Sequence, residues 1–320
     1  MKAMSTPSVT APGHPTHRVV RASTPRWLLV AGITAVLWLG VGVGARAQQP
    51  AAASAGALLA QRQAMQPQLR ASVFGEPLVL GSRERHDRLE GDVHAEVAHP
   101  FDAVRATFVS AAGVCEVLLL HLNVRACQPA VGAGGEGLSL LVGPKHAGAP
   151  GLNYRIAYAM HTEANDAGYL RVSLSAARGP LSTRDYRMVF EAVPIEGGRS
   201  FVHFGYAYGY GTLARMAMSA YLATAGRAKI GFTVVGQDAQ QQPAHVVGER
   251  AAVERNVMRY YLALLAHLSV APGAGGSTLL ARQRAWFALT ERHAAQLHEY
   301  SLDDYLREKR NDLVRSAAAK

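Results

Sequence analysis

Tyrosines recur at alternate positions between residues 154 and 210, and this spacing can place phenol hydroxyls on an otherwise apolar surface. Tyr154 and Tyr158 lie four residues apart, and Tyr206, Tyr208 and Tyr210 follow one another at intervals of two. Side chains on a β-strand alternate between its faces, so each group shares one face of its strand. Such a face would be an apolar wall with a few hydroxyls that orient a ligand. The alternative is that the rings pack a solid core.

Two arginines suggest a different chemistry. Arg255 and Arg259 lie four residues apart beside an apolar helical stripe, where a guanidinium can bind a carboxylate or phosphate through two hydrogen bonds. Arg250 and Glu254 have the same spacing, and such runs usually form a solvated, salt-bridged helix face. Both interpretations stay open at the level of sequence.

Motifs of common enzymes and metal sites are missing from the sequence. It contains no Gly-x-Ser-x-Gly, His-Glu-x-x-His or Walker pattern. His293 and His298 are five residues apart, which does not place them on one helical face, so we expect no metal. We also expect no cofactor. These absences weaken the enzyme class without removing it.

The first 47 residues have the layout of a secretory signal peptide. Three arginines between positions 18 and 26 precede an apolar run from Trp27 to Ala45, and a small-x-small cleavage pattern follows. The run is also about as long as a membrane-spanning helix, so an uncleaved anchor is the alternative. We expect the rest of the chain in the periplasm or cell envelope, or on the periplasmic side of an inner-membrane anchor.

Cys115 and Cys127 lie in this exported part. In an oxidising compartment they can form a disulfide, which in the chain-entropy model contributes roughly 3 kcal/mol. Two buried free thiols are the alternative.

The strongly basic balance of the chain comes partly from its leader. The formal net charge is +10, but residues 1–47 hold five basic residues and no acidic ones, so 28 Lys and Arg against 23 Asp and Glu leave +5. No basic cluster interleaved with aromatics remains, so we expect no nucleic-acid partner. The residual charge is compatible with membrane association, although a mildly basic solvated surface is more common.

Four alternating segments between Tyr154 and Tyr210 supply the elements that carry the tyrosines. Their apolar residues occupy even-numbered positions, and the links between them contain Asn, Asp, Gly and Pro. Period-two alternation with short turn-forming links predicts an antiparallel meander with one apolar face. His94 and His203 fall on the other face, where we expect them at the surface.

The remaining elements follow from the same patterns. Residues 48–81 form a linker with a short helix, a strand from Ser82 to His99 ends at Pro100, two short helices cover about 101–110 and 115–121, and strands cover 123–127 and 138–142. After the meander we expect a helix over 212–223, a strand over 230–235, a polar turn over 237–243 and a long helix over 248–270. The 271–320 tail is expected to be helical, with a solvated helix over 303–315.

This order resembles the START-like superfamily of lipid-transfer domains, birch-pollen-allergen-type proteins and polyketide cyclases. The resemblance covers about residues 82–270 and includes a Pro-Phe-x-x-Val step at Pro100, where a strand passes into the first helix. Residues 224–232 and 254–261 look like an exported proteobacterial branch of that superfamily, from which no site residue is carried over. The resemblance implies an α+β helix-grip fold, in which a curved antiparallel sheet wraps around a long C-terminal helix. Here extra helices follow.

The fold and the apolar face together predict a cavity between the sheet and the long helix. Its ligand is expected to be a hydrophobic small molecule or lipid, held by a carrier or sensor. The alternatives are a cyclase-like enzyme in the same cavity, because cyclases of this superfamily use scattered pocket residues, and a structural envelope protein with a filled core. The candidate ligand-binding residues are Tyr154, Tyr158, Met160, Leu174, Tyr186, Phe190, Phe204, Tyr206, Tyr208, Arg255, Arg259 and Tyr261.

Overall fold

An eight-stranded antiparallel sheet organises the chain. The computed structural model describes residues 53–132, 135–144, 153–224, 227, 229–271, 273 and 276–318. The sheet has the strand order β1-β2-β8-β7-β6-β5-β4-β3. Its strands are β1 (Leu78–Arg85), β2 (Arg88–Val97), β3 (Val124–Gly132), β4 (Gly135–Val142), β5 (Tyr154–Asn165), β6 (Leu170–Arg178), β7 (Arg184–Ile195) and β8 (Arg199–Gly209).

The predicted meander is confirmed as β5 to β8, each strand pairing with the next in antiparallel register. Met160 pairs with Leu174, Leu174 with Met188, and Met188 with Tyr206. These residues share an even-numbered row because alternate residues of each strand face the same side. The row runs across four strands, so the aromatic and apolar side chains form one continuous inner face.

Helix α6 (Gly248–Leu268) lies against this inner face, and α3 (Phe101–Phe108) and α4 (Ala111–Leu118) cover one end of it. The apolar stripe of α6 approaches the sheet closely at Gly91. A Cβ built there would lie 3.2 Å from Val257 and 3.3 Å from Val253, so a larger residue would push the helix outward. This is the α+β helix-grip arrangement that the sequence predicts.

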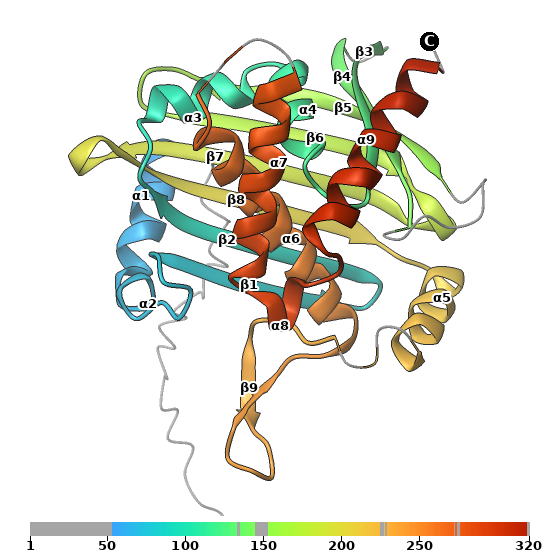
Figure 1. The fold of residues 1–320 in the computed structure, drawn as a ribbon. Helices are drawn as coiled ribbons and strands as arrows, with labels where there is room; N and C mark the ends of the chain where they lie inside the picture. Colours follow the sequence, from blue (N-terminus) through green and yellow to red (C-terminus); the bar gives the residue numbers. More distant parts are fainter. Residues whose placement is uncertain are drawn as a thin grey trace, which may run out of the picture. The chain divides into compact units, whose positions relative to one another are not determined.

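The C-terminal helices form a further layer over α6. Helices α7 (Gly276–Glu291), α8 (Ala294–Leu297) and α9 (Leu302–Ala318) follow the long helix, with α7 and α9 in front of it in Figure 1. The expectation of a solvated helix over 303–315 is wrong. Tyr305 and Lys309 are buried, since the Tyr305 hydroxyl donates to the Leu120 carbonyl at 2.8 Å and the Lys309 ammonium to the His121 carbonyl at 2.7 Å.

The outer face of the sheet is also partly covered. Helices α1 (Ala55–Ala64) and α2 (Gln66–Arg70) belong to the segment expected as a linker, and they pack Leu58 and Leu69 against Val193 and Phe201 in a second apolar cluster. The expectation of one apolar face is therefore incomplete. His94, expected at the surface, is only 5% exposed.

Two expected strands are hairpins instead. The strand predicted from Ser82 is preceded by its own partner, because the chain turns at His86, whose φ is 50°, in a turn without Gly or Pro. The strand predicted over 230–235 is displaced to β9 (Val234–Gln237), which pairs with β10 (Pro243–His245). This hairpin projects away from the sheet and helices (Figure 1), while α5 (Thr212–Ala223) has the predicted bounds.

The candidate signal peptide or anchor over residues 1–47 lies outside the described residues. Within the part of the chain that the structure describes, no helix combines the length and apolar character needed to cross a membrane.

Candidate functional site

The space between sheet and α6 is divided into two halves, and one of them is filled. Leu174, Phe190, Phe204 and Tyr261, all predicted site residues, surround a void of only about 30 Å³. Phe108 of α3 stacks on Phe190 with ring centroids 3.7 Å apart. We call this region the filled half. It corresponds to the solid-core alternative, because helices α3 and α4 place apolar side chains directly against the sheet.

The other half is open and contains two adjoining chambers, together called the tyrosine cavity. The larger chamber has a volume of about 520 Å³ and the smaller one about 310 Å³, within or near the usual size range of small-molecule sites, about 300–1,000 Å³. The chambers share five lining residues, namely Pro180, Leu181, Tyr186, Tyr206 and Asn256. The shared residues place the two chambers next to each other, within reach of one elongated ligand.

Tyrosine rings form the wall of this cavity. Tyr186 stacks on Tyr208 with centroids 5.4 Å apart, and Tyr206 lies 5.6 Å from Tyr208 and 5.8 Å from Tyr260 of α6. Tyr158 meets Tyr186 edge to face at 6.4 Å. These spacings are those of favourable aromatic pairs, which keep the rings ordered around an empty space.

The phenol hydroxyls of the cavity stay protonated. Burial, followed by the neighbouring tyrosines, raises the pKa of Tyr158 and Tyr206 well above the ordinary value of 10, and burial raises that of Tyr260 as well. The Tyr186 hydroxyl lies 2.8 Å from the Thr183 hydroxyl. Among the described residues, no hydrogen bond occupies the hydroxyls of Tyr158, Tyr206 and Tyr260, so they are available to a ligand as neutral donors or acceptors.

Gly179 explains how Tyr186 reaches its position. A Cβ built at Gly179 would lie 2.3 Å from the Tyr186 ring, a contact that real side chains do not make. The turn η1 (Pro180–Ser182) follows directly and supplies Pro180 and Leu181 to both chambers. The glycine therefore allows the ring to lie across the turn at the cavity wall.

The remaining polar lining is mostly uncharged. His121 lines the larger chamber, is 1% exposed and stacks on Tyr260 at 4.5 Å. Asn256 of α6 borders both chambers, and Glu249 in the first turn of the same helix borders the smaller one. Within the described lining, no arginine or lysine contributes to either chamber. The sequence did not predict His121, Asn256 or Glu249 as lining residues. A signal for the two on α6 was present, because Glu249, Asn256 and Tyr260 recur at helical spacing.

Arg255 and Arg259 face away from the cavity. Arg255 donates to the Ile230 carbonyl at 3.1 Å, and Arg259 donates to the Leu297 carbonyl at 3.3 Å and to the Glu299 carboxylate at 3.0 Å. Both are buried and neither lines the tyrosine cavity, so neither the solvated-face interpretation nor a ligand contact in that cavity fits their placement.

The solvated-face interpretation is also wrong for Glu254. This side chain is fully buried, and its carboxylate accepts hydrogen bonds from the backbone of Phe232 and Thr233.

The other predicted site residues are split between the two halves. Tyr154, 37% exposed, lines the larger chamber together with Tyr158, Tyr186 and Tyr206, whereas Tyr208 lines the smaller chamber. Met160 is buried in the main core and borders none of the cavities found in the described part. The structure thus brings the predicted tyrosines of the sheet together at the cavity, whereas Tyr261 of α6 lies with Phe190 and Phe204 in the filled half.

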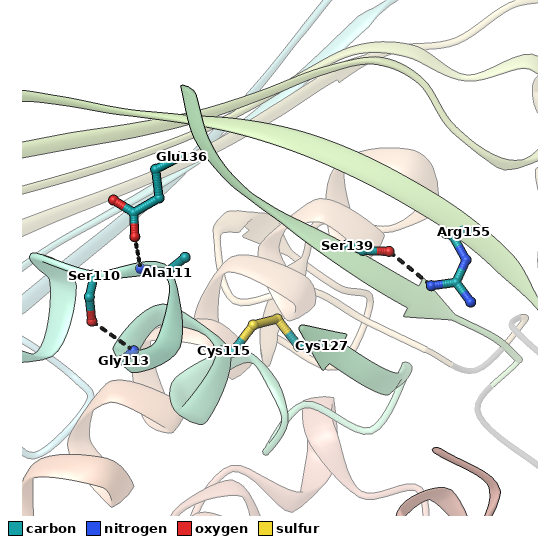
Figure 2. The surroundings of a disulfide bond; sticks show 8 residues. All are labelled: Ser110, Ala111, Gly113, Cys115, Cys127, Glu136, Ser139 and Arg155. Carbon is teal, nitrogen blue, oxygen red and sulfur yellow. Dashed lines mark hydrogen bonds between the residues drawn. A yellow bond between two sulfur atoms is a disulfide. The ribbon is translucent and has the colours of Figure 1, made fainter. Parts of the chain in front are cut away.

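The predicted disulfide between Cys115 and Cys127 is confirmed, with Cα atoms 5.3 Å apart. Figure 2 shows that it joins α4 to β3. At the start of α4, Ser110 accepts a hydrogen bond from the Gly113 amide, and the Glu136 carboxylate accepts one from the Ala111 amide (Figure 2). These contacts hold α4, which closes the filled half, to the edge of the sheet.

A polar network on the outer face was also missed. His94 stacks on His203 at 4.3 Å, and the His203 ring nitrogens lie 2.8 Å from Glu191 and 2.9 Å from Asp92. Burial disfavours charge on His203, but hydrogen bonds and charges of Asp92 and Glu191 outweigh it and raise its pKa to about 9. Burial and the His203 charge lower the pKa of His94 to about 3. The described residues contain no group of three or more His, Cys, Asp or Glu able to hold a metal.

The fold and the cavity define a helix-grip protein of START-like architecture. No family model and no curated protein matches the chain. Solved structures with similar folds include a START superfamily protein from Mycobacterium smegmatis, with 12% identity over 47% of this chain and 92% of its own, at a TM-score of 0.28. Norcoclaurine synthase from Thalictrum flavum has 17% identity over 47% and 86%, at 0.28, and human STARD10 has 8% over 52% and 74%, at 0.29. With values this low, the fold assignment rests on the strand order and helix packing described above.

Proposed function

We propose that this protein binds a hydrophobic small molecule or lipid in the tyrosine cavity, as an exported carrier or sensor. The observation that carries the proposal is the larger chamber of about 520 Å³, bounded by tyrosine rings and apolar side chains. A folded chain normally fills its interior, because empty space forfeits packing contacts. The same sheet and helix are tightly packed in the filled half, which argues that the open half is kept open for a ligand.

The disulfide supports the exported part of the proposal. Structural disulfides persist in oxidising compartments and are rare in the reducing cytosol. The Cys115–Cys127 bridge therefore agrees with the leader pattern over residues 1–47, which predicts a location in the periplasm or cell envelope. The fate of the leader is tested separately by determining the N-terminus of the exported protein, which should begin near Gln48 if the leader is cleaved.

Organic extraction of the natively purified protein, followed by mass spectrometry, tests the binding proposal. We expect an apolar compound at close to one equivalent per chain. The matched variant is Asn256→Phe, which fills the boundary between the chambers, and Val131→Phe is the control because Val131 is 91% exposed on β3. Asn256→Phe should lose the compound and Val131→Phe should keep it. A protein that holds no apolar compound after purification, and takes none up from a mixture of lipids, would refute the proposal.

One residue gives the enzyme alternative a specific observation. His121 is a titratable side chain beside the larger chamber, where an imidazole is suited to proton transfer on a bound substrate. An enzyme should convert the extracted compound with a pH-dependent rate that His121→Ala abolishes and His121→Gln fails to restore. Under the binding proposal the compound is recovered unchanged from both variants.

A further inference from the structure

The smaller chamber combines aromatic walls with a single carboxylate. Tyr186, Tyr206 and Tyr208 line it, and Glu249 is the charged side chain among its described lining residues. The aromatic rings present π-faces, which attract a cation placed within about 6 Å of the ring centroid. A ring wall and a carboxylate together favour positive charge in the space between them.

Among the described residues, no cationic side chain neutralises Glu249. In the described part of the chain no ion pair or hydrogen bond involves its side chain, whereas the adjacent Arg250 donates to the Ser82 side chain at 3.1 Å. The carboxylate does act on the cavity wall. Burial raises the pKa of Tyr208 most, with neighbouring tyrosines next, and the negative charge of Glu249 adds to the shift. The carboxylate and the phenol wall are therefore close enough to act on one bound group.

Two arginines on the surrounding elements already have partners within the chain. Arg184 pairs with the carboxylates of Asp87 and Asp185, and Arg215 donates to the His86 carbonyl. The Arg215 guanidinium also lies 5.1 Å from the centre of the Tyr210 ring. That contact shows that a phenol face of this cluster already accepts a cation, in this case one from the chain itself.

We propose that the smaller chamber is a subsite for an organic cation, such as a substituted ammonium group, and that the larger chamber holds the apolar remainder of the same ligand. This inference rests on the proposed function and narrows its ligand class. An anionic head group would meet the Glu249 carboxylate with no cation among the described lining residues to offset it. A strongly hydrated inorganic cation would gain less from the phenol walls than an alkylated one, which is desolvated at lower cost.

Isothermal titration calorimetry with three probes of equal chain length tests this subsite. The probes are decyltrimethylammonium, decanol and decyl sulfate, each below its micelle concentration, with the delipidated full chain at neutral pH. We expect the ammonium probe to bind about tenfold more tightly than decanol, and decyl sulfate to bind more weakly than either. Glu249→Gln should remove most of the preference for the ammonium probe and leave decanol affinity unchanged.

Two matched variants separate the subsite from indirect effects. Asp303→Asn removes a first-turn carboxylate from α9, as Glu249→Gln does from α6, and should leave all three affinities unchanged. Tyr208→Phe keeps the aromatic face and should keep the preference for the ammonium probe, whereas Tyr208→Leu should lose it. Circular dichroism confirms that each variant is folded.

The outcomes distinguish this inference from the proposed function. Equal affinity for the three probes, a preference for decyl sulfate, or an ammonium preference that survives Glu249→Gln would overturn the cation subsite while leaving a hydrophobic cavity. Failure of every probe to bind would overturn both.

Discussion

The filled half and the tyrosine cavity share strands β7 and β8, yet one is packed and the other is hollow. Phe204 and Tyr206 are neighbours on one face of β8, and Phe190 and Tyr186 lie on one face of β7. The difference lies in what is opposite. Helices α3 and α4 bring Phe108, with other apolar residues, against the phenylalanines, whereas the tyrosines face the η1 turn and α5. A cavity is therefore made where α3 and α4 leave part of a continuous apolar face uncovered.

Truncating Phe108 should have the largest effect and would make the filled half resemble the open one. Phe108→Ala removes a buried ring that stacks on Phe190, and we expect the free energy of unfolding to fall by about 4 kcal/mol. Tyr208→Ala in the open half should cost about 2 kcal/mol, because that ring already borders empty space. Urea denaturation measures both. Equal costs would contradict the division into two halves.

Removing the disulfide should have the next largest effect. Cys115→Ser with Cys127→Ser frees α4, which closes the filled half, from β3. The chain-entropy model gives a loss of about 3 kcal/mol for a loop of this length. Urea denaturation of the double variant and of the reduced wild-type protein should give the same loss. Ligand affinity in the tyrosine cavity should stay within about twofold, and a larger loss would mean that the two halves are coupled.

The sequence predicted the strands that line this interior, but not the division of the interior into a filled half and a cavity. The alternation of apolar and polar residues located β5 to β8, because this period of two is the same whichever helix packs on the sheet. It could not tell Phe204 from Tyr206, since both point inward and only the docking of α3 and α4 separates them. Arg255 and Arg259 were misplaced for a related reason. The apolar stripe of a helix indicates one buried face. On α6 a second face is also buried, because the C-terminal segment packs against it at Arg259.

The outer-face network should make stability, but not ligand binding, depend on pH. The pKa of His203 is raised to about 9 in the folded state, above the 6.5 of an unfolded chain, so its contribution is complete below pH 6.5 and is lost as the pH rises through 9. The destabilisation caused by His203→Gln should therefore be about 2 kcal/mol at pH 6 and should shrink towards zero by pH 10.

Comparing the variant with the wild type at each pH isolates His203 from Lys309. Burial lowers the pKa of Lys309 to about 7, and that group acts on stability in the opposite direction over the same range. Because the cavity tyrosines have raised pKa values, the affinity for a neutral ligand should stay constant between pH 6 and 9. A destabilisation by His203→Gln that does not change with pH would show that His203 is uncharged in the fold.

The smallest expected effect on stability comes from a single oxygen atom in the open half. The Tyr206 hydroxyl has no hydrogen-bond partner among the described residues, so Tyr206→Phe should change the free energy of unfolding by less than about 0.5 kcal/mol. The affinity for the co-purified ligand should nevertheless fall severalfold, because the hydroxyl is one of the few polar groups able to orient it. A stability loss above about 1 kcal/mol would mean that the Tyr206 hydroxyl forms a hydrogen bond within a packed core. The open half would then be packed in the same way as the filled half.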